Sequence, residues 1–319
     1  MSLGRYGWSP FFEAQLPGPA RSVPGRVRLA TARRAQLYAA KRVVNVSVPR
    51  NVGPAAVGDW LLFNPKRRTA VRVLQRRNAI ARNRPGHTAR RQILASNIDT
   101  ALVVATLDRD FSARQIERYL LCVEESGAKA VIVLNKADLC PDPGARTAAC
   151  ERANPGYPVV ATSAVAGSGL SALTRHLGDH DTVALAGPSG VGKSSLVNAL
   201  LQSDYLRVGS VRSQDRRGKH TTTRRELVAH PRGWLLMDLP GIRELFPWSR
   251  PETVDTVFTE ISELGGTCYY RDCRHGQEPG CSVLEALEEG RIDAGRLDSY
   301  RQLRQEQESL ARLIGERRK

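Results

Sequence analysis

The octapeptide from Gly187 to Ser194 constrains the fold more than any other feature of this 319-residue sequence. It reads Gly-Pro-Ser-Gly-Val-Gly-Lys-Ser and fits the pattern G-x-x-x-x-G-K-[ST] at every position. It follows the apolar run Val183–Ala186 and opens the helix-like run Ser195–Gln202, which is the strand–loop–helix context of a phosphate-binding loop. Glycines let backbone N–H groups close around phosphate oxygens, and the helix that follows adds a favourable dipole. The pattern therefore predicts a nucleotide-binding α/β domain.

Two side chains of this loop have separate expected roles. Lys193 should reach the β and γ phosphates, and Ser194 should ligate Mg²⁺. The residues expected to bind the nucleotide in this segment are Gly187, Pro188, Ser189, Gly190, Val191, Gly192, Lys193, Ser194 and Ser195.

A second motif points to guanine as the base. Asn135-Lys136-Ala137-Asp138 follows the apolar run Val131–Leu134. The carboxylate of Asp138 can accept hydrogen bonds from N1–H and N2–H₂ of guanine, a pattern that adenine does not present, and such a pairing discriminates strongly. Lys136 can lie along the base, and Asn135 can brace the neighbouring loops. An ordinary turn at the end of a strand is the alternative.

The next strand-like run, Val159–Ala161, leads into Thr162-Ser163-Ala164. In GTPases a Ser-Ala pair at this point offers backbone N–H to guanine O6, so Ser163 and Ala164 are expected to complete the base site. The triplet is too short to count without the motif at Asn135.

Asp238-Leu-Pro-Gly241 follows the apolar run Trp234–Met237 and matches D-x-x-G. Asp238 should hold Mg²⁺ through water, and the Gly241 N–H should sense the γ-phosphate. Many GTPases place a water-orienting Gln after this glycine, but the residue here is Ile242, which has no group to orient water.

Another residue must therefore position the water. The segment Gly218-Lys-His-Thr-Thr-Thr223 lies between the two phosphate motifs, and Thr222 is expected to close on Mg²⁺ and the γ-phosphate. Which threonine of Thr221–Thr223 ligates the metal stays open. His220 is the candidate catalytic residue, and a phosphate-side or surface histidine is the alternative.

A metal centre is expected near the C-terminus. Cys268, Cys273, His275 and Cys281 supply three thiolates and an imidazole within a short polar loop, a set suited to one tetrahedral, structural Zn²⁺. Disulfides are the alternative, and a reducing compartment disfavours them. Cys122, Cys140 and Cys150 are scattered and are expected to be packing or surface residues.

The N-terminal segment is strongly basic. Residues 1–98 hold 19 Lys or Arg and two acids, Glu13 and Asp59, so they carry +17, whereas the formal net charge of the whole chain is +16. Such a charge favours binding to a polyanion, most often nucleic acid; an arginine-rich solvated surface is the alternative.

The same segment contains five short apolar runs separated by turn residues, and this pattern predicts a small closed barrel of the OB type. The runs are Arg26–Ala30, Gln36–Ala39, Val43–Val48, Asp59–Phe63 and Ala70–Leu74. Arg76–Arg91 is interpreted as a linker or basic loop.

These patterns predict three domains. Residues 1–97 form the basic barrel with an N-terminal extension and the linker; residues 98–250 alternate strands and helices, which builds a parallel sheet; and residues 251–319 form a mostly helical, zinc-binding domain. No run reaches the roughly 18 apolar residues that span a bilayer, and no secretory signal is recognised. A cytoplasmic protein without a membrane partner is expected.

The order of the motifs is permuted. Ordinary GTPases run from the phosphate loop through D-x-x-G to N-K-x-D, whereas Asn135–Asp138 and Ser163-Ala164 here precede Gly187–Ser194 and Asp238–Gly241. The nucleotide senses only the spatial arrangement, so a circular permutation preserves the site. It places the second switch directly before the C-terminal domain.

The basic barrel, the permuted GTPase and the Cys-x₄-Cys-x-His-x₅-Cys loop together resemble the RsgA/YjeQ family over nearly the whole chain. The stretches Leu94–Asp99, Gly218–Thr223, Arg271–His275 and Glu278–Cys281 are also similar to that family. The resemblance implies a monomeric GTPase of late small-subunit (30S) ribosome maturation, with an OB-fold on rRNA and a zinc domain touching the subunit. It also implies slow hydrolysis that the subunit stimulates and a catalytic role for His220. The alternatives are a large-subunit assembly GTPase and an RNA-binding protein or RNA chaperone regulated by GTP.

Overall fold

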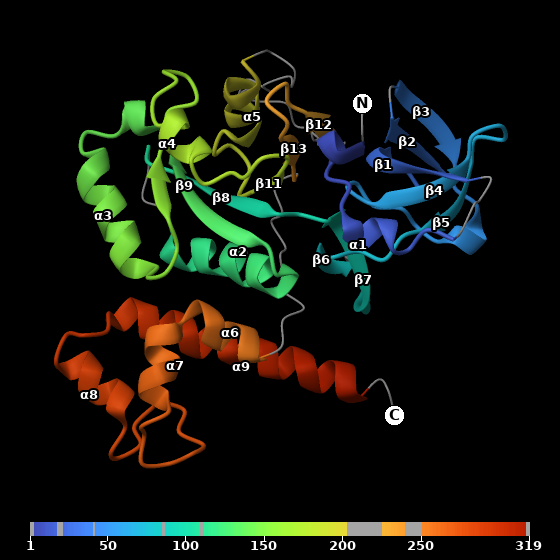
Figure 1. Ribbon diagram of the computed structural model, residues 1–319. Helices are drawn as coiled ribbons and strands as arrows, with labels where there is room; N and C mark the ends of the chain where they lie inside the picture. Colours follow the sequence, from blue (N-terminus) through green and yellow to red (C-terminus); the bar gives the residue numbers. More distant parts are fainter. Residues whose placement is uncertain are drawn as a thin grey trace, which may run out of the picture.

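The structure is a computed structural model that describes residues 3–17, 22–40, 42–84, 87–108, 112–202, 225–239 and 251–316. It consists of a barrel, a six-stranded sheet with helices on both faces, and a C-terminal group of helices (Figure 1). Within the described residues, no helix has the length and apolarity needed to cross a membrane.

The barrel contains the five strands that the apolar runs predict. The strands are β1 (Val23–Ala30), β2 (Arg34–Ala39), β3 (Arg42–Ser47), β4 (Trp60–Asn64) and β5 (Thr69–Val73), with η2 (Arg50–Val52) after β3. They close in the order β1-β2-β3-β5-β4. Leu37, Leu61 and Phe63 are buried in the interior, because alternate residues of each strand face inward. The predicted OB-type barrel is confirmed.

The N-terminal extension packs on the barrel through aromatic rings. It contains η1 (Leu3–Tyr6) and α1 (Pro10–Glu13). The ring of Tyr6 stacks on Tyr38 of β2 at a centroid distance of 4.7 Å, and Trp8 meets Trp60 of β4 edge-on at 4.6 Å. Aromatic pairs of this kind bury much apolar surface for few residues.

The stretch interpreted as a linker instead contains a two-stranded antiparallel hairpin. Its strands are β6 (Ala79–Arg84) and β7 (His87–Ser96). Ile80 of β6 and Leu94 of β7 are buried. The apolar residues lie at the base of the hairpin, and the arginines between them obscure the period-two pattern in the sequence.

The sheet has the order β10-β9-β8-β11-β13-β12. Its strands are β8 (Thr100–Thr106), β9 (Lys129–Asn135), β10 (Val159–Ala161), β11 (Thr182–Ala186), β12 (Leu227–Ala229) and β13 (Leu235–Asp238). The strands predicted here are present, and five of the six run parallel. At one edge of this otherwise parallel sheet, β12 pairs antiparallel with β13. A short connection through residues 230–234 joins these two strands as a hairpin, whereas a parallel pair needs a long crossover.

Helices cover both faces of the sheet. The helix α2 (Ala113–Ser126) packs on one face, where Leu120 and Val123 join a core cluster with Ala101 and Ile132. On the other face lie α4 (Leu170–Thr174) and α5 (Lys193–Leu201); the remaining elements are η3 (Ala137–Leu139) and α3 (Pro143–Ala153). Figure 1 shows α2 and α5 on opposite sides of β8 and β11. Because the central strands are buried on both faces, they appear in the sequence as continuous apolar runs.

The C-terminal part is helical, as predicted. It comprises α6 (Pro251–Val257), α7 (Thr259–Gly265), α8 (Ser282–Glu288) and α9 (Ala294–Glu316). It packs against α2 beneath the sheet in Figure 1. The guanidinium of Arg296 on α9 donates to the Glu117 carboxylate of α2 at 2.9 Å and to Glu260 of α7 at 2.8 Å. The buried Arg296 side chain therefore links α9 to both α2 and α7.

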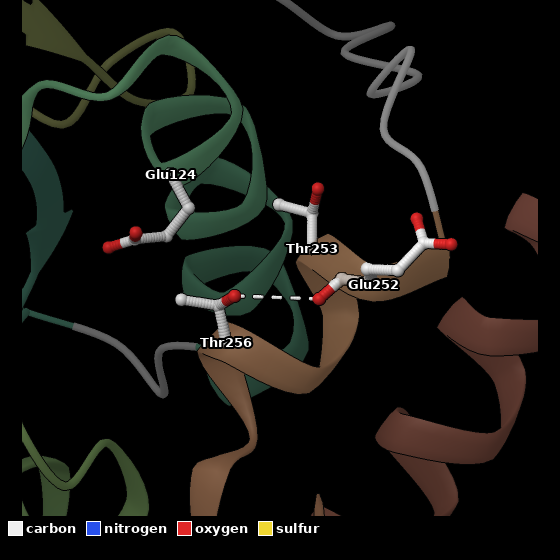
Figure 2. A pocket seen from close by; sticks show the side chains of 4 residues that line it. All are labelled: Glu124, Glu252, Thr253 and Thr256. Atoms are coloured by element: carbon white, nitrogen blue, oxygen red, sulfur yellow. Dashed lines mark hydrogen bonds between the residues drawn. The ribbon is translucent and has the colours of Figure 1, made fainter.

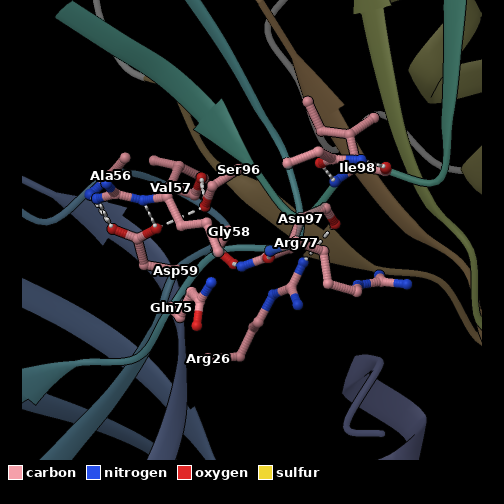
Figure 3. Close-up of polar contacts among 12 residues, drawn as sticks. Arg26, Ala56, Val57, Gly58, Asp59, Gln75, Arg77, Ser96, Asn97 and Ile98 are labelled. Carbon is pink, nitrogen blue, oxygen red and sulfur yellow. Dashed lines mark hydrogen bonds and ion pairs between the residues drawn. The ribbon is translucent and has the colours of Figure 1, made fainter. Parts of the chain in front are cut away.

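A polar cluster joins the barrel to the sheet (Figure 3). Arg26 of β1 is fully buried, and its Nη2 donates to the Asn97 carbonyl at 3.0 Å and to Thr182 Oγ1 at 3.1 Å. Thr182 is the first residue of β11, the strand that leads to the phosphate loop. Asp59 accepts from Ser96 Oγ at 2.6 Å and from Ala56 N at 2.7 Å. The barrel is therefore attached to the amino end of the central strand.

Candidate nucleotide site and metal centre

The predicted nucleotide residues converge at one edge of the sheet. Their segments follow β9, β10, β11 and β13 directly, and these strands are parallel to one another through β8. The carboxyl ends of parallel strands meet at the same edge, which is where ligands bind in open α/β sheets. The permuted chain thus brings the motifs together in space.

The phosphate loop is held by close backbone packing. Gly187 follows β11, and a Cβ at this position would stand 2.2 Å from the carbonyl oxygen of Val104 on β8. The Lys193 ammonium donates to the Gly187 carbonyl at 2.9 Å and to the Pro188 carbonyl at 2.8 Å. Burial lowers the pKa of Lys193, so an anion beside this ammonium would relieve a desolvation cost.

Asn135 ties three loops together. Its Nδ2 donates to the Val191 carbonyl of the phosphate loop at 2.9 Å, and its Oδ1 accepts from Ala164 N at 3.1 Å and from Thr162 Oγ1 at 3.3 Å. A Cβ at Gly192, where φ is +94°, would stand 2.3 Å from Asn135 Nδ2. Glycine is needed at position 192 for its backbone angle and for this close approach.

The predicted base-binding residues lie beside this brace. Asp138 is exposed at the start of η3, and Lys136 before it has the left-handed backbone angle φ +63°. The N–H of Ser163 donates to the Ser168 carbonyl at 3.0 Å, and the N–H of Ala164 is engaged by Asn135. Both backbone donors expected at guanine O6 therefore have partners within the protein, so a base would share them.

Asp238 and Ser194 face each other across the phosphate loop. Ser194 Oγ donates to Asp238 Oδ2 at 2.7 Å. The other oxygen, Oδ1, is buried and has no hydrogen-bond partner among the described residues. Burial raises the pKa of Asp238. A buried oxygen beside a hydroxyl and without a donor fits the hydrated Mg²⁺ that accompanies a nucleotide.

Several predicted residues lie outside the part of the chain that the structure describes. They are His220, Thr222, Gly241 and Ile242. Their roles stay predictions.

The predicted metal ligands do come together. The ligand atoms of Cys268, Cys273, His275 and Cys281 all lie within 4.8 Å of one another. The sulfurs of Cys268 and Cys281 are 3.8 Å apart, and His275 Nδ1 lies 3.6 Å from Cys268 Sγ and 3.4 Å from Cys281 Sγ. A tetrahedral ion with Zn–S bonds of about 2.3 Å separates two sulfurs by about 3.8 Å.

These distances exclude a disulfide between Cys268 and Cys281, since the S–S bond is about 2.05 Å. Burial lowers the pKa of His275, which favours the neutral imidazole that a metal requires. Cys122 and Cys150 are buried, and burial raises the pKa of both thiols. The cluster can hold a metal ion.

A hollow of about 340 Å³ lies away from these motifs, between α2 and α6 (Figure 2). Glu124, Glu252, Thr253 and Thr256 line it. The carboxylates of Glu124 and Glu252 would repel a phosphate, so this hollow is a poor candidate for the nucleotide site.

The sequence motifs missed one residue at this edge, Asp108. It stands two residues after β8, and its Oδ2 accepts from the Lys136 ammonium at 2.6 Å. The position of Asp108 just after an apolar run is a sequence signal for a ligand-binding residue, because ligands bind at the carboxyl ends of parallel strands. Its pairing with Lys136 becomes visible only in the folded structure.

Comparison with known proteins gives a consistent family. The family model described as RsgA GTPase matches residues 73–247. The chain is 38% identical to a protein of Opitutus terrae named small ribosomal subunit biogenesis GTPase RsgA, over 98% of this chain and 92% of that protein. It is 40% identical to the protein of the same name from Syntrophotalea carbinolica, over 83% and 77% of the two chains.

Solved structures agree with the fold. The crystal structure of YjeQ from Thermotoga maritima superposes with a TM-score of 0.67 at 26% identity, covering 90% of this chain and 98% of that chain. The structure of YloQ, described as a circularly permuted GTPase, has a TM-score of 0.66 at 24% identity and covers 90% and 96%. The order of the motifs, their meeting at one sheet edge and these likenesses agree, and the chain belongs to the RsgA family of GTPases.

Proposed function

We propose that this protein hydrolyses GTP to drive a late step in the biogenesis of the small ribosomal subunit, that it binds rRNA, and that the subunit stimulates its hydrolysis. The observation that carries the proposal is the likeness over 98% of the chain to a relative named for this task, so barrel, GTPase and metal-binding part are all included. We further infer that it acts as a monomer in the cytoplasm.

Two loops are proposed to bind GTP or GDP: the base loop, which contains Asn135–Asp138, binds the guanine, and the phosphate loop binds the phosphates. Asp138 selects guanine, Lys136 packs along the base, and Ser163 and Ala164 offer backbone N–H groups. Lys193 and the loop Gly187–Ser195 hold the phosphates. The brace from Asn135 to Val191 supports this assignment, because it fixes the distance between the two halves of the site.

The magnesium that accompanies GTP would be held by Ser194, Asp238 and Thr222. It supplies positive charge to the phosphate oxygens. In hydrolysis, Lys193 stabilises charge on the β and γ phosphates, and the N–H of Gly241 binds the γ-phosphate. His220 orients the attacking water, because Ile242 cannot. Positioning and charge stabilisation account for most of the catalysis in phosphoryl transfer.

The surface proposed for rRNA is a basic rim at one end of the barrel. It consists of exposed residues at two turns: Arg33 and Arg34, the first residue of β2, at the β1–β2 turn, and Lys66, Arg67 and Arg68 in the β4–β5 turn. Both turns flank the end of β3, since Val48 N donates to the Arg33 carbonyl at 2.8 Å and Ser47 N to the Arg68 carbonyl at 2.9 Å. Five cations on adjacent turns suit a phosphate backbone.

The metal held by Cys268, Cys273, His275 and Cys281 is proposed to be one structural zinc ion. Four protein ligands leave no open position for water, and thiolate with imidazole is a typical zinc donor set.

The test is single-turnover GTP hydrolysis without ribosomes, with purified 30S subunits and with purified 50S subunits. Acceleration by 30S alone is the expected result. Acceleration by 50S would instead assign the protein to large-subunit assembly, and RNA binding without any acceleration would favour an RNA chaperone. The variant His220→Ala should keep GTP affinity and 30S binding but lose stimulated hydrolysis by at least about tenfold.

A further inference from the structure

An ion pair at the edge of the sheet joins Lys136 of the base motif to Asp108, which lies outside the recognised nucleotide motifs. Lys136 Nζ donates to Asp108 Oδ2 at 2.6 Å, and the two side chains are 26% and 15% exposed. Lys136 follows β9, and Asp108 comes after the neighbouring strand β8. The Lys136 side chain is therefore directed across the end of β8, the strand that also pairs with β11 and its phosphate loop.

Asp108 is itself held in place. Its Oδ1 accepts from Thr106 Oγ1 at 2.5 Å, and the N–H of Leu107, which is buried, donates to the Asn135 carbonyl at 2.8 Å. Two consecutive residues after β8 thus hold two consecutive residues at the end of β9, one pair through the backbone and the other through side chains. A carboxylate fixed in this way can orient a flexible ammonium.

The backbone of Lys136 adds an independent observation. Its φ of +63° is uncommon for a residue with a Cβ, and such strain gathers at functional sites because the surroundings over-determine it. The left-handed turn sends the chain into η3, where Asp138 lies, while the ammonium stays on Asp108. An ammonium engaged by Asp108 is not available to the Asp138 carboxylate two residues on.

We propose that Asp108 is a positioning residue of the guanine site, which holds the Lys136 side chain where the base packs before the nucleotide arrives. The inference rests on the assignment of Lys136 to the base, made under the proposed function. The benefit is preorganisation: a long side chain ordered in the free protein loses little freedom when the ligand binds.

The expected effect is on affinity and not on the chemical step. Removing the carboxylate charge with Asp108→Asn should weaken GDP and GTP binding about three- to tenfold, the range for ordering one long side chain. Turnover at saturating GTP should stay unchanged, since Asp108 touches neither phosphate nor water in this assignment. The affinity of Asp108→Asn for inosine triphosphate, which lacks the N2 group, should fall by the same factor as its affinity for GTP. In this assignment the Lys136 stem contacts the face of the purine, whereas Asp138 binds the N2 group.

The experiment is a double-mutant cycle measured with fluorescent GDP on the full chain. It uses Asp108→Asn, Lys136→Met and the combination, with Asp298→Asn as a matched control, because Asp298 pairs with Arg301 on the exposed side of α9. If Asp108 acts through Lys136, Asp108→Asn weakens binding in the wild-type background and has no further effect beside Lys136→Met. Equal weakening in both backgrounds, or none in either, overturns the proposal.

Asp138→Asn separates this inference from the assignment on which it rests. If that variant fails to exchange GTP preference for xanthosine triphosphate, the base loop itself is misassigned. If it does exchange preference while Asp108→Asn binds GDP like wild type, only the role of Asp108 is wrong. Should Asp108→Asn lower the melting temperature, its effect on GDP affinity is also measured beside Lys136→Arg, which keeps a cation facing Asp108. A loss beside Lys136→Arg as in wild type, with none beside Lys136→Met, supports the role; an equal loss in all three backgrounds refutes it.

Discussion

The side-chain amide of Asn135 donates a 2.9 Å hydrogen bond to the carbonyl oxygen of Val191, so the loop that reads the base is tied to the loop that holds the phosphates. Gly192 lies against this amide group, since a Cβ at Gly192 would stand 2.3 Å from Asn135 Nδ2. The bond and the glycine form one structural unit.

The first prediction concerns this unit. Gly192→Ala should displace Asn135 and weaken GDP binding about tenfold or more, since it combines backbone strain with the breaking of a hydrogen bond. Gly190→Ala is the matched control, because φ there is +86° but nothing lies within 4 Å of an added Cβ. Titration with fluorescent GDP should separate the two variants. Equal losses would mean that backbone strain alone, and not the approach to Asn135, requires glycine.

The second prediction concerns Asp238. Burial raises the pKa of this carboxyl above its unfolded value, so its ionised form is a cost to the nucleotide-free fold. That cost is absent below the unfolded pKa and grows as pH rises through the folded pKa. Asp238→Asn should therefore make the nucleotide-free protein equally or more stable near neutral pH and remove this part of the decline with pH. Magnesium-dependent GTP affinity should fall about tenfold or more, because the variant has no buried charge to face the cation.

Thermal melting of both proteins without nucleotide, from about pH 4 to pH 8, checks the stability part. The melting temperature of the variant relative to wild type should rise with pH. A variant that is less stable than wild type throughout this range would show that the Ser194 hydrogen bond outweighs the burial of charge.

The strands and the phosphate loop could be predicted because their patterns are local. Each central strand is buried on both faces and so forms a continuous apolar run, as in Ala101–Ala105 of β8 and Val183–Ala186 of β11. The helix α3 gave no such signal, since Cys150 is its one buried residue. The sequence does not predict the β6–β7 hairpin, because its apolar residues lie at its base and the arginines between them suggest a loop.

The candidate site likewise contains residues that the sequence predicts and residues that it does not. Asp138 and Lys193 lie in motifs whose spacing the sequence displays, whereas the partners of these motifs come from distant segments. Nothing near Lys136 indicates Asp108, 28 residues earlier, because parallel register sets their approach. Arg26 and Thr182 are 156 residues apart, and only the docking of barrel on sheet brings them together.

The third prediction concerns the metal. Purified protein should carry one zinc ion, and Cys273→Ser should lose it and unfold the C-terminal part, because a structural zinc site contributes directly to folding. Nucleotide binding should change little, since the cluster lies on a different part of the chain from the phosphate loop. Cys140→Ser, which removes a thiol outside the cluster, is the control. Elemental analysis and circular dichroism are the measurements, and protein that is fully folded without metal would refute the structural role.

The last prediction concerns the basic rim of the barrel. Phosphate contacts release counterions, so the affinity for 30S rRNA should fall steeply as salt rises. Removing one cation that neutralises a phosphate should reduce the slope of log affinity against log salt by about 0.9 for a duplex and 0.7 for a single strand. Replacing Arg33, Lys66 and Arg67 by alanine should reduce that slope by about 2 to 3 if all three bind phosphate.

The control for this variant replaces Lys129, Arg175 and Arg232, which are exposed on the sheet domain, by alanine. It removes one lysine and two arginines, as the rim variant does, and so changes the net charge equally. Filter binding from about 50 to 200 mM salt then separates a localised interaction from bulk charge. A slope reduced only in the rim variant supports the rim as the rRNA surface; equal reductions would mean that the net charge of the chain, and not the barrel, attracts the RNA.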